Sequence, residues 1–329
     1  MEVLFAQYTE PSMTSLPMIP LFPAPSPVQP MDGLRRALGG GPRLLIKRDD
    51  ALPFAFGGNK VRKMQLVAAD ALNAGADTLI TSGGIQSNHA RVTAAAAAKL
   101  GLRCILVVNG SQPAVPTGNA LLDGLLGAEV RYVDDRSWRA PGMEAAAEEV
   151  RKLGRTPYII PIGASTPLGA CGFIGAAGEL RAQVQTPPDV ILHSTSSGGT
   201  QAGLIAGCAS AMPGTEIIGV SADESSASLE ATIRDLLRGM PALLGMPEAQ
   251  FAGSRIAVDD RFVGGGYGVP TDASRAAIEL VARTEAIFLD PTYTAKAMAG
   301  LIARIRAGEF REEQTVLFWH TGGQVGLFA

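Results

Sequence analysis

The stretch that decides the fold runs from Phe56 to Arg91. It contains two motifs, Phe56-Gly57-Gly58-Asn59-Lys60-Val61-Arg62-Lys63 and Ser82-Gly83-Gly84-Ile85-Gln86-Ser87-Asn88-His89. Between them lie an amphipathic run at 61–74 and an apolar run at 77–81. Such runs are typical of a helix and of a short buried strand. Each motif is therefore expected to join a glycine turn to the start of a helix.

Lys60 follows the Gly57-Gly58 pair directly. Glycine permits backbone conformations that residues with a Cβ avoid, so we expect a tight turn and then Lys60 in the first turn of a helix. The field at a helix N-terminus disfavours a second positive charge, so an amine there loses its proton more easily, as imine formation requires. On these residues alone, a solvated surface lysine is the alternative interpretation.

The second motif ends the apolar run at 77–81 with Ser82-Gly83-Gly84. A helix is expected at 89–100. The unpaired N–H groups at the start of such a helix point outward and bind anions. Hydrogen-bonding side chains gather there, at Gln86, Ser87, Asn88 and His89. An ordinary strand-to-helix turn is the alternative interpretation.

A second candidate anion site is Ser196-Ser197-Gly198-Gly199-Thr200-Gln201, which follows an apolar run at 189–193. Backbone N–H groups, hydroxyl groups and a helix dipole would converge there on a dianion such as phosphate. The motif is neither a Walker loop nor the GxGxxG dinucleotide fingerprint. A simple helix cap is the alternative.

Strand and helix patterns alternate along the chain, which predicts an α/β fold with mainly parallel sheets covered by helices on both faces. Pro161–Pro167 interrupts the alternation and is expected to mark the crossing between two domains. Helices are expected at 32–38, 61–74, 89–100, 118–126, 142–153, 168–183, 201–211, 228–239, 272–285 and 295–307. Strands are expected at 44–50, 77–81, 103–108, 129–133, 158–160, 189–193, 216–221 and 315–319.

Composition excludes several classes of protein. The 329 residues carry a formal net charge of -3 without a basic stripe, so nucleic-acid binding is not expected. Three scattered cysteines and three histidines show no ligand spacing, so neither a disulfide framework nor a metal site is expected. No signal peptide and no membrane-spanning run are visible, which favours a cytoplasmic protein. Residues 1–30 are rich in proline and are expected to form an extended arm.

The two opening motifs resemble those of the D-cysteine desulfhydrase and 1-aminocyclopropane-1-carboxylate (ACC) deaminase family. The resemblance extends from about Pro42 to the C-terminus. It implies a pyridoxal 5'-phosphate (PLP) enzyme of fold type II that forms a homodimer, with the cofactor in the cleft between two domains. On this basis the large, phosphate-binding domain is expected at 1–53 and 167–329, and the small domain at 54–166.

The resemblance also implies roles for single residues. The lysine that bonds to the cofactor is Lys60. The other cofactor-binding positions fall on Asn59, Asn88, Ser197, Gly198, Gly199, Thr200 and Thr321. Substrate-binding positions fall on Gln86, Ser87, Asn88, His89 and Thr294, and catalytic roles beside Lys60 fall on Ser87, Tyr267 and Tyr293. Family members usually carry glycine where this chain has Ser196, which leaves the phosphate donors open.

Thr294 and Thr321 bear on the choice of reaction. The ring-opening ACC deaminases carry glutamate and leucine at these positions, whereas desulfhydrase-type members carry small hydroxyl residues. The expected reaction is therefore β-elimination on a small amino acid, with D-cysteine giving pyruvate, sulfide and ammonia. ACC deaminase remains an alternative, and L-cysteate sulfo-lyase is another. The sulfonate of L-cysteate requires an additional cation in the pocket, and the sequence does not show where such a cation lies. A non-catalytic protein that binds PLP or an amino acid is the alternative from another class.

Overall fold

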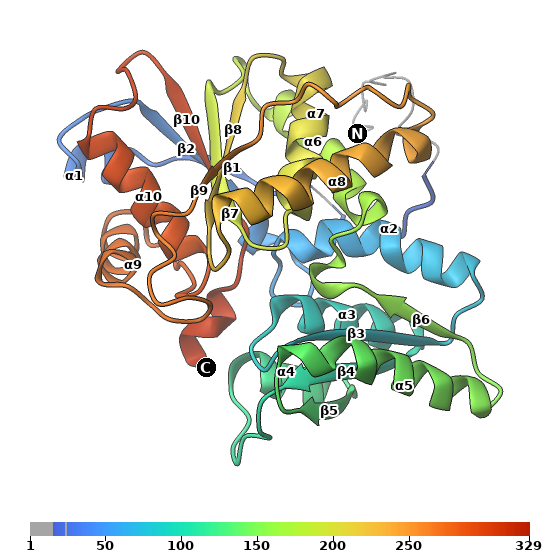
Figure 1. The fold of residues 1–329 in the computed structure, drawn as a ribbon. Helices are drawn as coiled ribbons and strands as arrows, with labels where there is room; N and C mark the ends of the chain where they lie inside the picture. The colour runs from blue at the N-terminus through green and yellow to red at the C-terminus, as the bar shows by residue number, and fades with distance from the viewer. Residues whose placement is uncertain (1–15, 24) are drawn as a thin grey trace, which may run out of the picture.

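The computed structural model describes residues 16–23 and 25–329, and it contains two β-sheets. The larger sheet has the strand order β1-β2-β10-β7-β8-β9 and the smaller one the order β5-β4-β3-β6 (Figure 1). The larger sheet is built from β1 (Val28–Pro30), β2 (Arg43–Arg48), β7 (Val190–Thr195), β8 (Glu216–Ser221), β9 (Ala257–Asp259) and β10 (Thr315–His320). The smaller sheet is built from β3 (Thr78–Gly84), β4 (Arg103–Asn109), β5 (Glu129–Val133) and β6 (Pro157–Ile160).

Helices follow most strands, and all strand pairs except β1–β2 are parallel. This arrangement is the predicted α/β class. The α-helices are α1 (Asp32–Ala37), α2 (Asn59–Asn73), α3 (Asn88–Leu100), α4 (Gly118–Leu125), α5 (Arg139–Lys152), α6 (Pro167–Gln183), α7 (Gly199–Ala211), α8 (Ser226–Leu244), α9 (Asp272–Glu285) and α10 (Thr294–Arg306). Short 3-10 helices are η2 (Asp49–Ala51), η3 (Arg136–Trp138), η4 (Ile162–Ala164) and η5 (Gln324–Phe328).

Each sheet has a hydrophobic core on both faces. In β10, Phe318 and Trp319 are both fully buried but belong to different cores, because successive strand residues point to opposite faces. The Trp319 face packs against α6, α7 and α8, and the Phe318 face against α1, α9 and α10. Leu79 and Ile80 divide in the same way between the two faces of the smaller sheet. Helices therefore cover both faces of both sheets.

Three elements differ from the sequence-based expectation. The end of the proline-rich arm is β1, which pairs antiparallel with β2, whereas residues 1–15 and 24 of the arm lie outside the described residues. Strand β9 was not predicted, because three residues are too short to show a period. Helix α8 continues through Pro241 to Leu244, because the apolar face that it buries extends to that residue.

Helix α2 lies between the two sheets and packs on both α6 and α3 (Figure 1). The first motif follows β2 and η2, whereas the second motif and the turn at 196–199 follow the carboxyl ends of β3 and β7, and Thr321 follows that of β10. Ligands of open parallel sheets bind at this edge. No helix among the described residues is both long and apolar enough to cross a bilayer.

Candidate active site

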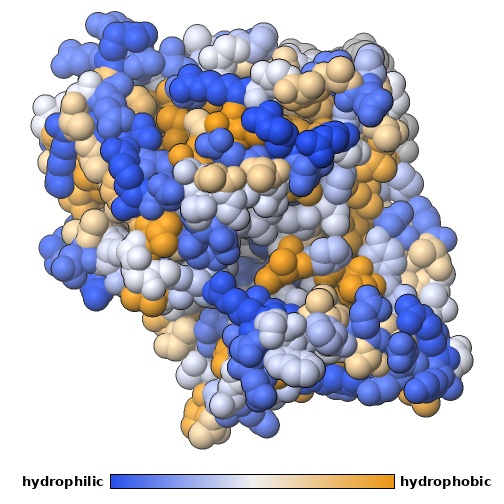
Figure 2. All heavy atoms as spheres, in the orientation of Figure 1, coloured by the Kyte–Doolittle hydropathy of each residue, from blue (hydrophilic) through white to orange (hydrophobic). Residues whose placement is uncertain are grey.

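A cavity of about 240 Å³ brings the predicted motifs together. Its position agrees with Figure 2, where the surface is hollowed between the upper and the lower body of the molecule. The predicted site residues that line this cavity are Asn59, Lys60, Ser87, Asn88, His89, Ser197, Gly198, Thr200, Tyr267, Tyr293 and Thr321. They come from six segments that are far apart in the chain.

The turn before α2 is fastened to the larger sheet. Gly58 has a φ of 101°, and a Cβ added to it would lie 3.0 Å from the carbonyl oxygen of Thr321. The N–H group of Asn59 donates to that same carbonyl at 3.0 Å. The side-chain amide of Asn59 donates to Thr200 Oγ1 at 2.9 Å. Only glycine therefore fits at position 58, and the start of α2 is fixed against both β10 and α7.

Lys60 is the second residue of α2, and its side chain lines the cavity. Burial lowers its pKa to about 8. No hydrogen bond or ion pair engages its amine among the residues that the structure describes. Lys60 is therefore placed to present a partly deprotonated, unengaged amine to a ligand in the cavity.

Sequence reasoning missed Lys63, one helical turn after Lys60. Its amine donates to the Gly163 carbonyl at 3.1 Å and to Ser165 Oγ at 3.0 Å, and Ser165 Oγ is hydrogen-bonded to Ser197 Oγ at 2.6 Å. Burial and the nearby Lys60 lower the pKa of Lys63. A Cβ added to Gly199 would lie 2.6 Å from this amine. A lysine amine therefore lies directly behind the turn at 196–199.

The turn at 196–199 has the geometry of an anion cradle. Gly198 has a φ of 74° and caps α7, whose first residue is Gly199. The first N–H groups of a helix have no hydrogen-bond partner within the helix and point away from its N-terminus, which here faces the cavity. Ser196 lines the cavity beside Ser197, so the departure from the family pattern leaves a hydroxyl group at this position. Gly199 contributes its backbone to the turn but does not itself line the cavity.

A second set of free N–H groups lies at the start of α3. Ser87 caps this helix, and its Oγ accepts a hydrogen bond from Ala90 N at 3.2 Å, so its proton remains available to a ligand. Asn88 and His89 are the first two residues of the helix, and both line the cavity. This arrangement suits a carboxylate.

His89 is held in one neutral tautomer. Thr81 Oγ1 donates its proton to the Ile160 carbonyl at 2.7 Å, so it can only accept from His89 Nε2, which lies 2.8 Å away. Burial, followed by the charges of Lys60 and Lys63, lowers the pKa of His89 well below its ordinary value. His89 Nδ1 is buried and has no partner among the described residues. It is therefore an acceptor for a donor group in the cavity.

Tyr267 and Tyr293 form a pair at one wall of the cavity. Their hydroxyl oxygens are 2.6 Å apart, and the rings meet edge to face with centroids 5.7 Å apart. Burial raises the pKa of both phenols, most strongly that of Tyr293. Both side chains therefore keep their protons near neutral pH; one proton lies in the hydrogen bond between them, and the other hydroxyl can donate to a ligand.

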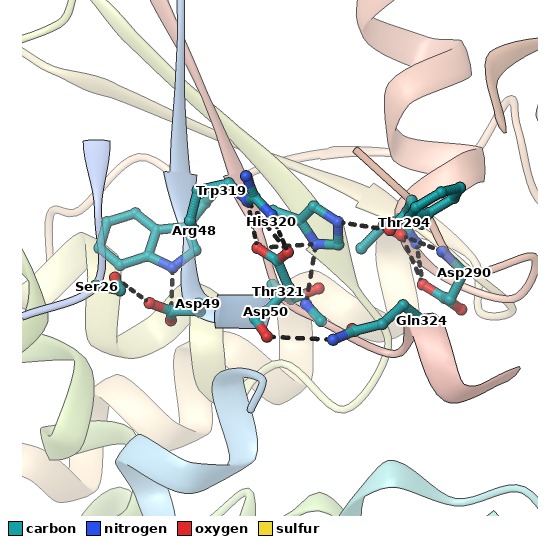
Figure 3. A network of polar contacts seen from close by, with 12 residues as sticks. Ser26, Arg48, Asp49, Asp50, Asp290, Thr294, Trp319, His320, Thr321 and Gln324 are labelled. Atoms are coloured by element: carbon teal, nitrogen blue, oxygen red, sulfur yellow. Dashed lines mark hydrogen bonds and ion pairs between the residues drawn. The ribbon is translucent and has the colours of Figure 1, made fainter. Parts of the chain in front are cut away.

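Thr321 and Thr294 occupy different environments (Figure 3). Thr321 lines the cavity, and its hydroxyl group lies 3.0 Å from that of Ser194. Thr294 is fully buried and does not line the cavity, because its hydroxyl group accepts from Asp290 N at 2.8 Å and donates to Asp290 Oδ1 at 2.7 Å. Any effect of Thr294 on a ligand would therefore pass through its neighbours.

Gln86 also lies outside the lining. Its side chain accepts from Asn119 N at 2.7 Å and donates to the Thr117 carbonyl at 3.1 Å. Asn119 in turn donates to Asn88 Oδ1 at 2.9 Å. Gln86 thus holds α4 against the residue that reaches the cavity, and the structure gives it no direct contact with the cavity.

Other charged groups in the cavity wall were not foreseen. Arg136 and Arg139 line the cavity from the side of the smaller sheet, and Asp223 and Glu224 line it from the loop after β8. Their local sequence is that of ordinary exposed loops and helix starts, so no sequence signal marks them. The described residues contain no group of three or more His, Cys, Asp and Glu side chains placed to hold a metal ion.

The cavity suits a cofactor with an aldehyde at one end and a phosphate at the other. The amine of Lys60 faces it, and the α7 cradle, backed by Lys63, opens into the same space. Buried polar atoms in its wall have no partner among the described residues, namely Thr195 Oγ1 and His89 Nδ1. A bound group is expected to satisfy such atoms. The donor set therefore fits PLP.

Comparison with known proteins gives the same result. Residues 19–322 match the family described as pyridoxal-phosphate dependent enzyme. A D-cysteine desulfhydrase from Klebsiella pneumoniae (strain 342) is 40% identical over 325 residues, which cover 97% of each chain. A crystal structure of an ACC deaminase homologue superimposes with a TM-score of 0.88 at 36% identity, covering 96% of this chain and 94% of that one.

A more distant structure supports the fold alone. Threonine deaminase isoform 2 from Solanum lycopersicum has a TM-score of 0.67 at 21% identity, covering 91% of this chain and 79% of that one. The predicted family and cofactor are thus confirmed by the two nearer relatives and by the family match. The chain therefore belongs to the pyridoxal-phosphate-dependent enzymes, within the family of D-cysteine desulfhydrase and ACC deaminase, and its cofactor is pyridoxal 5'-phosphate.

Proposed function

We propose that this enzyme is a lyase that converts D-cysteine to pyruvate, sulfide and ammonia. The observation that carries the proposal is that the Lys60 amine and the Ser197–Thr200 turn open into one cavity, which the start of α3 also lines. The D-cysteine desulfhydrase at 40% identity supports this choice of substrate. PLP, when bound, supplies the electron sink that makes the Cα–H bond of the substrate acidic.

The residues of α3 position the substrate. Its carboxylate is bound by the N–H groups at the start of the helix and by the hydroxyl group of Ser87. The side chain of Asn88 is oriented by Arg91, whose Nη1 donates to Asn88 Oδ1 at 3.0 Å and whose Nη2 donates to the Gly57 carbonyl at 2.9 Å. Arg91 therefore links the carboxylate site to the turn that presents Lys60.

Protons move through Lys60 and the tyrosine pair. With PLP and substrate bound, Lys60 would be the base that accepts the Cα proton, because its lowered pKa keeps part of its population neutral. Tyr293 and Tyr267 keep their protons, and because one of the two protons lies in their shared hydrogen bond of 2.6 Å, the other is free to be donated toward the departing sulfur. Thr321 lacks a charge, so it can hydrogen-bond a ring nitrogen without protonating it, which suits elimination.

A substrate panel tests the proposal. PLP-loaded enzyme is incubated with D-cysteine, L-cysteine and ACC, and sulfide, pyruvate and 2-oxobutyrate are measured. We expect sulfide and pyruvate from D-cysteine. Turnover of ACC alone would show that the cavity is that of a ring-opening deaminase, and binding without turnover of any substrate would show a non-catalytic protein.

Substitution of Lys60 tests its role separately from fold stability. Lys60→Ala should abolish turnover and the visible absorbance of covalently held cofactor, because the amine that forms the bond is gone. Lys99→Ala is the matched control, since Lys99 is exposed in the last turn of α3. Unchanged cofactor absorbance in the Lys60 variant would show that another lysine holds PLP.

The larger organisation is also proposed. By analogy with the family, the enzyme is a cytoplasmic homodimer with a large domain at 1–53 and 167–329 and a small domain at 54–166. The net charge of -3 gives no support for binding to nucleic acid. Light scattering on the purified holoenzyme checks the dimer, and a monomeric mass would refute it.

A further inference from the structure

Lys296 is a buried lysine that has no part in the reaction described so far. It is the third residue of α10, and its side chain has no exposed surface. Its amine donates to three backbone carbonyls, those of Ala222 at 2.9 Å, Val263 at 2.8 Å and Gly266 at 2.8 Å. A carbonyl oxygen only accepts hydrogen bonds, and a lysine amine has three N–H donors only when it is protonated. The hydrogen bonds therefore enclose a positive charge within the backbone.

Position 296 is unfavourable for a cation in two respects. Burial lowers the pKa of Lys296, and the charges of Asp223 and Asp290 oppose this effect without cancelling it. The first turn of a helix also disfavours a positive charge because of the helix dipole, and Lys296 lies in the first turn of α10. The three hydrogen bonds to carbonyls compensate for both effects, so the segments that supply those carbonyls show what the charge holds together.

The three carbonyls belong to segments that line the active-site cavity. One carbonyl directly precedes Asp223 in the loop after β8, and another directly precedes Tyr267. Tyr293 is the residue before α10 and lies three positions before Lys296. One ammonium group therefore joins the segments that carry Asp223, Tyr267 and Tyr293.

The loop at 263–268, which carries Tyr267, is a segment that needs such an attachment. Three of its glycines have φ values between 64° and 109°, and fixing glycine in one conformation costs more entropy than fixing any other residue. The carbonyls of Val263 and Gly266 accept backbone N–H groups at 3.4 and 3.3 Å. Lys296 donates to the same two carbonyls at 2.8 Å, so its hydrogen bonds are the shorter ones that fasten this loop.

We propose that Lys296 is a positioning residue for the proton donor of the reaction. Its ammonium group holds the loop of Tyr267 against the start of α10, beside Tyr293, so that the two hydroxyl oxygens meet at 2.6 Å. One tyrosine proton lies in that hydrogen bond, and the other is left for the departing group of the substrate. This inference rests on the proposed elimination from D-cysteine.

Two leaving groups differ in their need for this proton. In D-cysteine the Cβ–S bond breaks with its electron pair on sulfur, which takes the free tyrosine proton, and the phenolate regains a proton from water. In β-chloro-D-alanine chloride leaves with the electron pair and needs no proton, because it is a very weak base. In both cases the three-carbon unit takes up water and gives pyruvate and ammonia, without an oxidant or a reductant. A displaced tyrosine pair should therefore slow the loss of sulfide more than the loss of chloride.

The test compares these two substrates in PLP-loaded variants. Lys296→Met keeps an apolar stem but removes all three donors, and the ratio of kcat for D-cysteine to kcat for β-chloro-D-alanine should fall about tenfold or more, a part of what a positioned proton donor contributes. Lys296→Gln keeps two N–H donors, should give a smaller fall, and replaces the methionine variant if that protein does not fold. Arg306→Met, exposed in the last turn of the same helix, is the matched control and should leave the ratio unchanged.

Two further measurements link the effect to the tyrosine loop. In a Tyr267→Phe background, either Lys296 substitution should cause little further fall in the ratio, because both changes act on the same proton donor and their effects are then not additive. Amide hydrogen exchange in the segment 263–268 of the holoenzyme should be faster in the Lys296 variants than in the native protein, since the loop loses its attachment.

Three outcomes would overturn the positioning role. They are an equal slowing of both substrates, fully additive losses in the double variant, and unchanged hydrogen exchange at 263–268. Any of them would leave Lys296 as a contributor to fold stability alone. A native enzyme that releases no sulfide from D-cysteine would instead refute the proposed function, and the exchange measurement would still decide whether Lys296 holds the loop.

Discussion

Substitution of Arg62 by methionine offers a quantitative test of how the catalytic helix is fastened. Arg62 is two residues after Lys60 and is almost fully buried. It donates five hydrogen bonds, two to Asp49, two to Glu179 and one to Ser26, at 2.7 to 2.9 Å. Asp49 has no exposed surface and would keep only its bonds from Ser26 and Trp319, at 2.8 Å each (Figure 3).

The expected loss follows from the buried carboxylate. Removing one partner of a buried ion pair costs about 3 to 5 kcal/mol, because the other charge stays desolvated and uncompensated. The two remaining donors to Asp49 place the expected loss near the lower end, at about 3 kcal/mol in the free energy of unfolding. Arg283→Met, on the exposed side of α9, is the matched control and should change stability by less than about 0.5 kcal/mol.

The pH dependence has a definite sign. In the native protein burial tends to raise the pKa of Asp49, but Arg62, together with Trp319 and Lys47, more than offsets this and the pKa is lowered. The stabilisation is therefore present above the ordinary aspartate pKa and is lost as pH falls through the lowered value. In Arg62→Met burial is no longer offset, so the pKa of Asp49 rises and protonation at acidic pH relieves the penalty. The stability difference between the two proteins should shrink as pH falls.

The assay is urea unfolding of the PLP-loaded proteins, followed by tryptophan fluorescence, because Trp319 donates to Asp49 and reports on this site. Curves are compared between about pH 7 and about pH 4, which is close to the ordinary pKa of aspartate. A difference below about 1 kcal/mol at neutral pH, or one that does not change with pH, would refute the argument from an unpaired buried charge.

Two further predictions concern the chemistry. The rate at which the apoenzyme bonds covalently to PLP should rise with pH and level off above about 8, because the neutral form of Lys60 reacts. Visible absorbance measures this rate. A rise only near the ordinary lysine pKa of 10.5 would show that burial has no effect on the pKa of Lys60. Tyr293→Phe should lower kcat for D-cysteine about 100-fold, the usual worth of a general acid, whereas Tyr132→Phe should not; equal rates in the two variants would remove the tyrosine pair from the reaction.

The amino-acid sequence alone was sufficient for the elements that depend on local order. The alternation of apolar runs and amphipathic runs predicted the helices within a few residues, because period and glycine turns are read from neighbours in the chain. Lys60, Ser87 and the turn at 196–199 were also recognised from the sequence as candidate site residues, since each lies where a glycine turn meets the start of a helix. A resemblance to a known family then identified the cofactor as PLP, which a lysine and a phosphate cradle can bind at its two ends.

Only the tertiary structure decided which side chains meet. Lys63 and Arg139 resemble ordinary charged residues of helices in sequence, but one is buried behind the phosphate turn and the other faces the cavity. Thr294, expected at the substrate, is instead engaged by Asp290. The tautomer of His89 depends on Thr81 and on a carbonyl of a different strand. Such contacts join segments many residues apart, so no local pattern records them, and packing alone determines whether a charge faces water or a ligand.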